Sequence, residues 1–225
     1  MSSVRQDRTG NIDTASRYFD DGYLHLENFV PAEVARGFLA RLVTDLARQG
    51  VHLEQLRKEQ PLLRRPASEL YGYHYPPMAT FHWGMTPAVS AALGRELLPT
   101  YAYFRIYRGG DICRVHGDRP ACEHSASLTL AYSDEKPWPL EFSSSPIDKP
   151  YERADDLFSD SELARAVAMQ PGDAVLYRGV EYHHGRTQPN PNAWSAHLFL
   201  HWVERDGPFA SDAFDGQTPP ARVTL

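Results

Sequence analysis

Residues 113–130 join a His-x-Asp triplet to an alternating polar and apolar run, and this segment limits the folds open to the chain. His116 and Asp118 stand two residues apart, so in an extended chain their side chains lie on one face. An imidazole and a carboxylate side by side supply two of the three ligands of a 2-His-1-carboxylate iron site. In the run that follows, polar residues alternate with apolar ones: Ser125, Ser127 and Thr129 against Ala126, Leu128 and Leu130. This alternation predicts a half-buried strand.

The triplet alone is weak evidence. A chain with 10 His and 29 Asp and Glu contains about one such spacing by chance. His25-Leu26-Glu27 and His52-Leu53-Glu54 show the same spacing, and we interpret both as chance. The meaning of His116-Gly117-Asp118 therefore depends on the rest of the chain.

Composition narrows the class of protein. With 225 residues and 42% hydrophobic content, the chain can bury the core of one domain. Its net charge of −6 argues against nucleic acid as a main partner. We expect no membrane partner, because no apolar run could span a bilayer and the N-terminus lacks a signal-peptide core. Cys113 and Cys122 are the only cysteines, which predicts free thiols and a cytoplasmic location. Oligomeric state is not predicted.

The first hundred residues favour helices. Residues 1–12 are expected to form a flexible lead-in, and Asp13 can cap a short helix through Phe19. An apolar run over 23–30 predicts a strand. A helix should then run from Pro31 to Gly50, with its apolar stripe on a sheet. That stripe consists of Val34, Phe38, Leu42 and Leu46.

Residues 51–85 are dense in aromatic side chains around Pro76-Pro77. We interpret them as a loop that either plugs one end of the core or forms a lid facing the substrate. Thr86-Pro87 should open a further helix that ends by Pro99.

Short strands are expected in the second half, over 101–108, 138–142, 174–177 and 194–203. A surface loop over 143–162 and a short helix over 161–167 should separate them. Most of the expected helices thus lie in the N-terminal half of the chain, and short strands separated by turns follow them. This order indicates a mainly β fold, namely a jelly roll with an N-terminal helical layer. We expect one domain, with a helical part (13–100), a jelly-roll core (101–205) and a C-terminal tail (206–225).

A third metal ligand should come from a later strand. His183 and His184 are the candidates: His184 follows Asp118 by 66 residues, directly after the strand that the Pro171-Gly172-Asp173 turn opens. Either histidine could serve.

The chain contains a His-x-Asp triplet, then strands, a Pro-Gly-Asp turn, a further strand and a late histidine. With these features in this order, the sequence resembles the iron(II)- and 2-oxoglutarate-dependent dioxygenases over nearly its whole length. The segments that carry the resemblance are Phe19–Val30, Leu98–Tyr107, His116–Glu123 and Pro171–Gly179, and they look like a little-characterised bacterial and phage branch. The resemblance implies a cupin-like double-stranded β-helix in which His116, Asp118 and His184 bind Fe(II). The branch tends to show His-Trp-Arg where this chain has His184-Gly185-Arg186, so Gly185 is a departure that keeps the register.

The resemblance also implies the cofactor and the reaction. In the family, 2-oxoglutarate occupies two iron positions and molecular oxygen the third. Hydroxylation of a C–H bond in an amino acid, peptide or natural-product intermediate is the expected outcome. The distal carboxylate of 2-oxoglutarate needs a fixed cation. Arg186 is our first candidate, Arg105 its rival and Arg119 a weaker third. Tyr103 and Thr129 complete the expected cofactor-binding residues.

Two other readings stay open. One is a jelly-roll metalloenzyme that does not use 2-oxoglutarate, and the other is a non-catalytic module that binds a metal or another ligand. The chain lacks a Gly-x-Ser-x-Gly elbow, a Cys-x-x-Cys pair and a phosphate-binding glycine loop, so those chemistries have no support.

Overall fold

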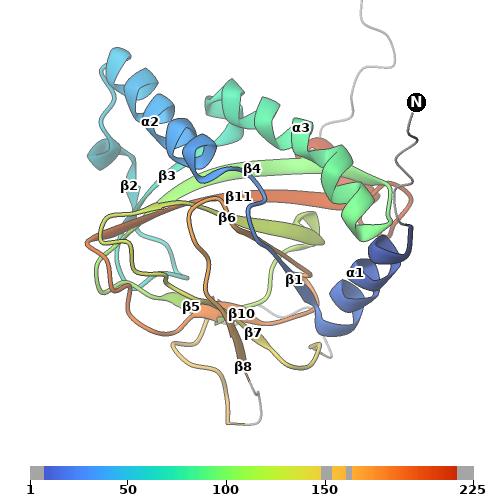
Figure 1. The fold of residues 1–225 in the computed structure, drawn as a ribbon. Coiled ribbons are helices and arrows are strands. Elements are labelled where there is room, and N and C mark those ends of the chain that lie inside the picture. Colours follow the sequence, from blue (N-terminus) through green and yellow to red (C-terminus); the bar gives the residue numbers. More distant parts are fainter. Residues whose placement is uncertain (1–7, 148–153, 161–163, 217–225) are drawn as a thin grey trace, which may run out of the picture.

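Two antiparallel sheets face each other in the computed structural model, which describes residues 8–147, 154–160 and 164–216 (Figure 1). The seven-stranded sheet has the order β1-β9-β6-β11-β4-β3-β2. Its strands are β1 (Tyr23–Leu26), β2 (Arg57–Lys58), β3 (Ala67–Tyr71), β4 (Leu97–Arg108), β6 (His124–Tyr132), β9 (Ala174–Tyr177) and β11 (Trp194–Glu204). The four-stranded sheet has the order β5-β10-β7-β8, from β5 (Cys113–His116), β10 (His184–Arg186), β7 (Leu140–Ser143) and β8 (Ala164–Val167). This arrangement confirms the predicted jelly roll.

Helices cover the outer face of the large sheet. In Figure 1, α2 (Ala32–Arg48) and α3 (Pro76–Leu93) lie above β4, β11 and β6, while α1 (Arg8–Asp21) lies beside β1. In the described ranges, three short 3-10 turns connect the elements: η1 (Leu53–Leu56), η2 (Gly72–His74) and η3 (Pro120–Cys122). The segment η4 (Ala210–Gly216) follows β11 and contains non-helical residues. None of the helices in the described ranges has the length and hydropathy of a membrane span.

The period-2 pattern of β4 separates two environments. Its residues Ala102, Phe104 and Ile106 pack into the main hydrophobic core together with residues of α2 and α3. The alternate residues Tyr101, Tyr103, Arg105 and Tyr107 therefore lie on the face toward the small sheet. The face of β4 toward the small sheet thus carries polar and aromatic side chains rather than aliphatic ones.

Four local expectations were wrong. Strand β6 is buried on both faces, not half-buried, because helices cover one side and the small sheet the other. The helix α3 begins at Pro76, not at Thr86, since prolines fit the first turn of a helix, and Pro87 lies inside it. Residues 164–167 form β8, paired with β7, instead of a helix; residues 161–163 lie outside the described ranges. The helix α1 begins at Arg8, inside the expected lead-in.

The expected helix after Pro31 is present as α2, and it ends before Gly50, as predicted. Leu42 and Leu46 are buried against the sheet, but Val34 is half-exposed, so the buried stripe starts later than expected.

Candidate metal centre

The small sheet brings two histidines together. β10 pairs antiparallel with β5 so that His184 lies opposite His116, and their ring centroids are 4.3 Å apart. The strands approach closely at Gly185, where an added Cβ would lie 2.8 Å from the carbonyl oxygen of Cys113. A side chain at this position would push these strands apart, so the glycine at position 185 has a local structural reason.

The third residue, Asp118, follows β5 and is positioned by a glycine. Its backbone N–H donates to the carbonyl oxygen of Gly179 (2.8 Å). A Cβ on Gly179 would overlap the Asp118 carboxylate, so only glycine leaves room for the carboxylate at this place. Sequence reasoning missed Gly179, because nothing in the local sequence distinguishes it from an ordinary turn residue.

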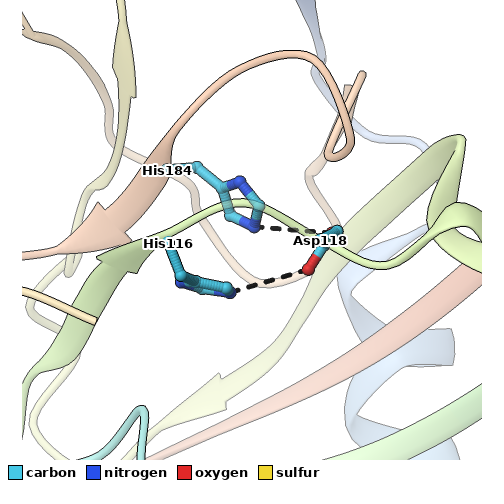
Figure 2. Close-up of side chains that lie close together, drawn as sticks. All are labelled: His116, Asp118 and His184. Carbon is cyan, nitrogen blue, oxygen red and sulfur yellow. Dashed lines mark ion pairs between the residues drawn. The ribbon is translucent and has the colours of Figure 1, made fainter. Parts of the chain in front are cut away.

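The three side chains converge on one point (Figure 2). Nε2 of His116 lies 3.6 Å from Asp118 Oδ1, and Nε2 of His184 lies 3.5 Å from Asp118 Oδ2. One ligand atom from each residue lies within 4.8 Å of the others. All three side chains are at most 15% exposed. His183 belongs to none of the clusters of close ligand atoms found in the described part of the chain.

The hydrogen bonds prepare these residues for a cation. Nδ1 of His116 donates to the carbonyl oxygen of Arg114 (2.7 Å), and Nδ1 of His184 donates to that of Tyr182 (3.1 Å). With the proton on Nδ1, each Nε2 presents a lone pair to the centre. Asp118 Oδ2 is buried and has no hydrogen-bond partner among the described residues. Two imidazole Nε2 atoms and one unsatisfied carboxylate fit a divalent metal ion, and the donor set suits non-haem iron.

The protonation states agree with this reading. Burial lowers the pKa of His116 to about 4, so its imidazole is neutral at pH 7. Burial acts to raise the pKa of Asp118, but the adjacent His184 outweighs it and holds that pKa well below its usual value. Asp118 is therefore an anion, as a metal ligand must be. Burial acts to lower the pKa of His184, but the adjacent Asp118 outweighs it and raises that pKa, so a cation that binds here displaces any proton on His184.

Arg186, the first candidate for the cofactor carboxylate, is 1% exposed. Its Nη1 donates to the carbonyl oxygen of Trp138 (2.5 Å), its Nη2 lies 3.5 Å from Ser127 Oγ, and the guanidinium carbon stands 4.9 Å from the Trp138 ring centroid. Within the described ranges it forms no ion pair with a carboxylate. A buried cation without a counter-ion is costly, so an anionic ligand would stabilise this arrangement.

The rival Arg105 is already neutralised. It donates to Glu69 through Nε and to the hydroxyl of Tyr107, and Glu69 has a fully buried side chain. Tyr103 packs against the Arg105 guanidinium, 5.0 Å from its ring centroid. Arg119 lies over Tyr101 and pairs with Asp215 at the surface.

Thr129 lies near the Arg186 side of the interior. Its hydroxyl is 3.3 Å from Nδ1 of His197, whose ring also lies within 6.4 Å of Trp138. Nε2 of His197 is buried and has no hydrogen-bond partner in the described part of the chain. Thr129 and His197 thus place a buried ring nitrogen without a hydrogen-bond partner near the Trp138 ring on which the Arg186 guanidinium packs.

A second group beside Asp118 was also missed. Cys122 Sγ and a ring nitrogen of His201 lie within 4.8 Å of an Asp118 carboxylate oxygen. Tyr101 contacts both: its hydroxyl is 3.1 Å from Cys122 Sγ, and its ring centroid is 4.5 Å from that of His201. The nearest sequence signal was the position of His201 on the interior face of the last strand.

No protein-family model and no curated protein matches the chain. Solved structures do. The non-haem α-ketoglutarate-dependent carbocyclase SnoK of nogalamycin biosynthesis is 11% identical with a TM-score of 0.67, over 92% of this chain and 87% of its own. The epimerase SnoN of the same biosynthesis is 14% identical with a TM-score of 0.67, over 96% and 94%. HygX from Streptomyces hygroscopicus, solved with nickel and 2-oxoglutarate, is 12% identical with a TM-score of 0.63, over 89% and 88%.

The chain therefore has the fold of the non-haem iron, 2-oxoglutarate-dependent oxygenases, which confirms the fold expected from the resemblance. At these identities the likeness establishes the fold, and the chemistry must be argued from the side chains.

Proposed function

We propose that this protein is a non-haem iron(II)- and 2-oxoglutarate-dependent oxygenase whose iron is bound by His116, Asp118 and His184. The observation that carries the proposal is the convergence of two Nε2 lone pairs and one unpartnered carboxylate oxygen within 4.8 Å. This is the 2-His-1-carboxylate set, which leaves coordination positions open for a cofactor and oxygen.

The cofactor assignment rests on Arg186. A guanidinium that is buried and lacks a carboxylate can bind the distal carboxylate of 2-oxoglutarate through two parallel hydrogen bonds. Nε2 of His197 and the hydroxyl of Ser127 are further polar groups on the same side. HygX, which shares the fold, was solved with 2-oxoglutarate bound. Arg105 is the weaker candidate, because Glu69 already neutralises it.

When bound, the iron and 2-oxoglutarate supply an oxidation in which oxygen and 2-oxoglutarate yield succinate, carbon dioxide and an oxidised substrate C–H bond. The protein holds His116 neutral and Asp118 ionised, so that these two ligands bind a cation without losing a proton. Tyr177 and Phe142 pack against the His184 ring, with centroids 4.7 and 6.3 Å away, and exclude water from that side.

We propose a small molecule as substrate, of the natural-product, amino-acid or peptide class, and hydroxylation as the outcome. SnoK and SnoN belong to nogalamycin biosynthesis, and HygX was also solved with hygromycin B. A cytoplasmic location agrees with the two buried, unbridged cysteines.

The test uses the visible charge-transfer band of the anaerobic Fe(II)–2-oxoglutarate complex, together with succinate release in air. We expect both signals in the wild type and in His183→Ala, and neither in His184→Ala, because only the latter removes a ligand. His183 is the matched control, since it neighbours His184 and is also buried. A wild type that binds iron but gives neither signal would exclude 2-oxoglutarate. If His183→Ala loses the band and His184→Ala keeps it, the ligand assignment is wrong.

A further inference from the structure

A second cluster of metal-ligand side chains lies apart from the triad and shares no residue with it. Glu123 follows η3, His124 begins β6 and Glu204 ends β11. One ligand atom from each lies within 4.8 Å of the other two. Nothing in the proposed oxygenase reaction uses these residues.

His124 is the informative member of this cluster. Its side chain is 3% exposed, and its Nδ1 lies 2.8 Å from the hydroxyl of Tyr18. The other nitrogen, Nε2, is buried, has no hydrogen-bond partner in the described ranges and lies 3.6 Å from Glu204 Oε1. A buried ring nitrogen directed at two carboxylates without a hydrogen bond lacks a partner that a cation could supply.

The two carboxylates are held in place. Glu123 Oε2 accepts a hydrogen bond from the backbone N–H of Glu204 (2.8 Å), which fixes the Glu123 side chain and leaves its Oε1 available. The cation paired with Glu204 is Arg95, whose Nε is 3.3 Å from Oε1 and whose side chain is 48% exposed. Glu204 thus pairs with one half-exposed guanidinium, and the neighbouring Glu123 adds a second carboxylate beside the His124 imidazole.

We propose that Glu123, His124 and Glu204 bind a second divalent cation, for which Zn²⁺ is the best match. One imidazole nitrogen and two carboxylate oxygens are ligands that Zn²⁺ accepts, and it binds such sites more tightly than Mn²⁺ or Fe²⁺. In the metal-bound form Nδ1–H of His124 donates to the Tyr18 hydroxyl, and the Nε2 lone pair binds the cation. Because Tyr18 belongs to α1, the ion would fasten this helix to the ends of β6 and β11.

The experiment counts Zn²⁺ bound to the tag-free full-length chain by equilibrium dialysis, with folding checked by circular dichroism. We expect two equivalents for the wild type, one for Asp118→Ala and one for His124→Gln. His25→Gln is the matched control, because His25 also faces a carboxylate, Asp173 at 3.5 Å, but only one; it should keep two equivalents. A His124→Gln variant that binds as many equivalents as the wild type would overturn the proposal, whatever the total; loss of an equivalent in Asp118→Ala alone reports on the triad and not on this site.

A variant of Arg95 distinguishes a metal site from a simple network of ion pairs. If a cation binds here, Arg95 competes with it for Glu204, so Arg95→Met should tighten Zn²⁺ binding in the Asp118→Ala background by about threefold. If His124, Glu204 and Arg95 only pair with one another, Arg95→Met leaves no Zn²⁺ affinity to improve. Unchanged or weaker Zn²⁺ binding in Arg95→Met would therefore count against the site. This test does not depend on iron, 2-oxoglutarate or turnover.

Discussion

Replacing Arg186 by methionine should separate cofactor binding from folding. The substitution keeps the length of the apolar stem and removes a guanidinium that is 1% exposed and has no carboxylate partner within the described ranges. We expect iron binding to persist and 2-oxoglutarate binding to weaken sharply.

The expected loss of 2-oxoglutarate affinity can be estimated from the hydrogen bonds that the buried Arg186 guanidinium can donate. A hydrogen bond to a charged group contributes about 1.5–3 kcal/mol, and Arg186 can offer the distal carboxylate a bidentate pair. A loss of about 3 kcal/mol raises the dissociation constant of 2-oxoglutarate by about two orders of magnitude. The stability gained from the cofactor should fall as well. At a 2-oxoglutarate concentration a hundredfold above the wild-type dissociation constant, that gain is about 2.7 kcal/mol in the wild type, and most of it should vanish in the variant.

Arg105→Met is the contrasting variant. It would leave the carboxylate of Glu69, whose side chain is fully buried, without its cation. Breaking a buried pair in this way costs about 3–5 kcal/mol of folding stability. Arg105→Met should therefore be strongly destabilised even without cofactor, whereas Arg186→Met strands no carboxylate and should lose less stability.

The assay titrates the charge-transfer band of the anaerobic iron complex with 2-oxoglutarate and, as a control ligand, with 2-oxobutyrate, which lacks the distal carboxylate. The wild type and Arg186→Met should bind 2-oxobutyrate with similar affinity. A 2-oxoglutarate dissociation constant within threefold of wild type in Arg186→Met would refute the reasoning. A folded Arg105→Met variant that loses 2-oxoglutarate would move the carboxylate site to Arg105.

Three further outcomes are expected. Gly179→Ala should weaken iron binding by displacing the metal-binding carboxylate, whereas Gly84→Ala, with open space around it, should not; iron titration of both variants tests this. Burial lowers the pKa of His82 from 6.5 to about 3, so the folded state binds fewer protons than the unfolded one and stability is lost as pH falls from 6.5 toward 3. His82→Gln should flatten that loss, by up to about 1.4 kcal/mol per pH unit, in urea unfolding at several pH values; an unchanged slope would contradict the assignment. Thiol titration of denatured, unreduced protein should find both Cys113 and Cys122; finding neither would disprove free thiols.

The fold was predictable from the sequence where the periodicity of apolar residues alone determines which side of an element is buried. The period-2 pattern of β4 gave both the strand and its two faces, and the i, i+4 pattern after Pro31 gave α2. Prediction failed where tertiary contacts overrule local signals. β6 alternates polar and apolar residues, yet both faces are covered, because its polar side lines the interior opposite the small sheet. Residues 164–167 are a strand because β7 offers them a partner, which no local signal reveals.

The metal triad could be proposed from the sequence because its members stand in distinct patterns: His116 and Asp118 two residues apart, and His184 just after a buried strand. The sequence left His184 and His183 as alternatives, and the register of the β5–β10 pair, in which His184 lies opposite His116, favours His184. The role of Gly179 could not be predicted from the sequence, because it depends on a tertiary contact: a side chain at position 179 would overlap the Asp118 carboxylate.

The two arginines show most clearly what the sequence leaves undecided. Arg105 and Arg186 each lie on a strand with polar or aromatic neighbours, and either could bind an anion. Glu69 stands 36 residues before Arg105 in the chain, but the β3–β4 register sets the two directly opposite each other, and their pairing neutralises both charges. Arg186 lies opposite Cys113, which offers no such charge. The register of two strand pairs, rather than the residue types, therefore supports Arg186 over Arg105 as the proposed partner of the cofactor carboxylate.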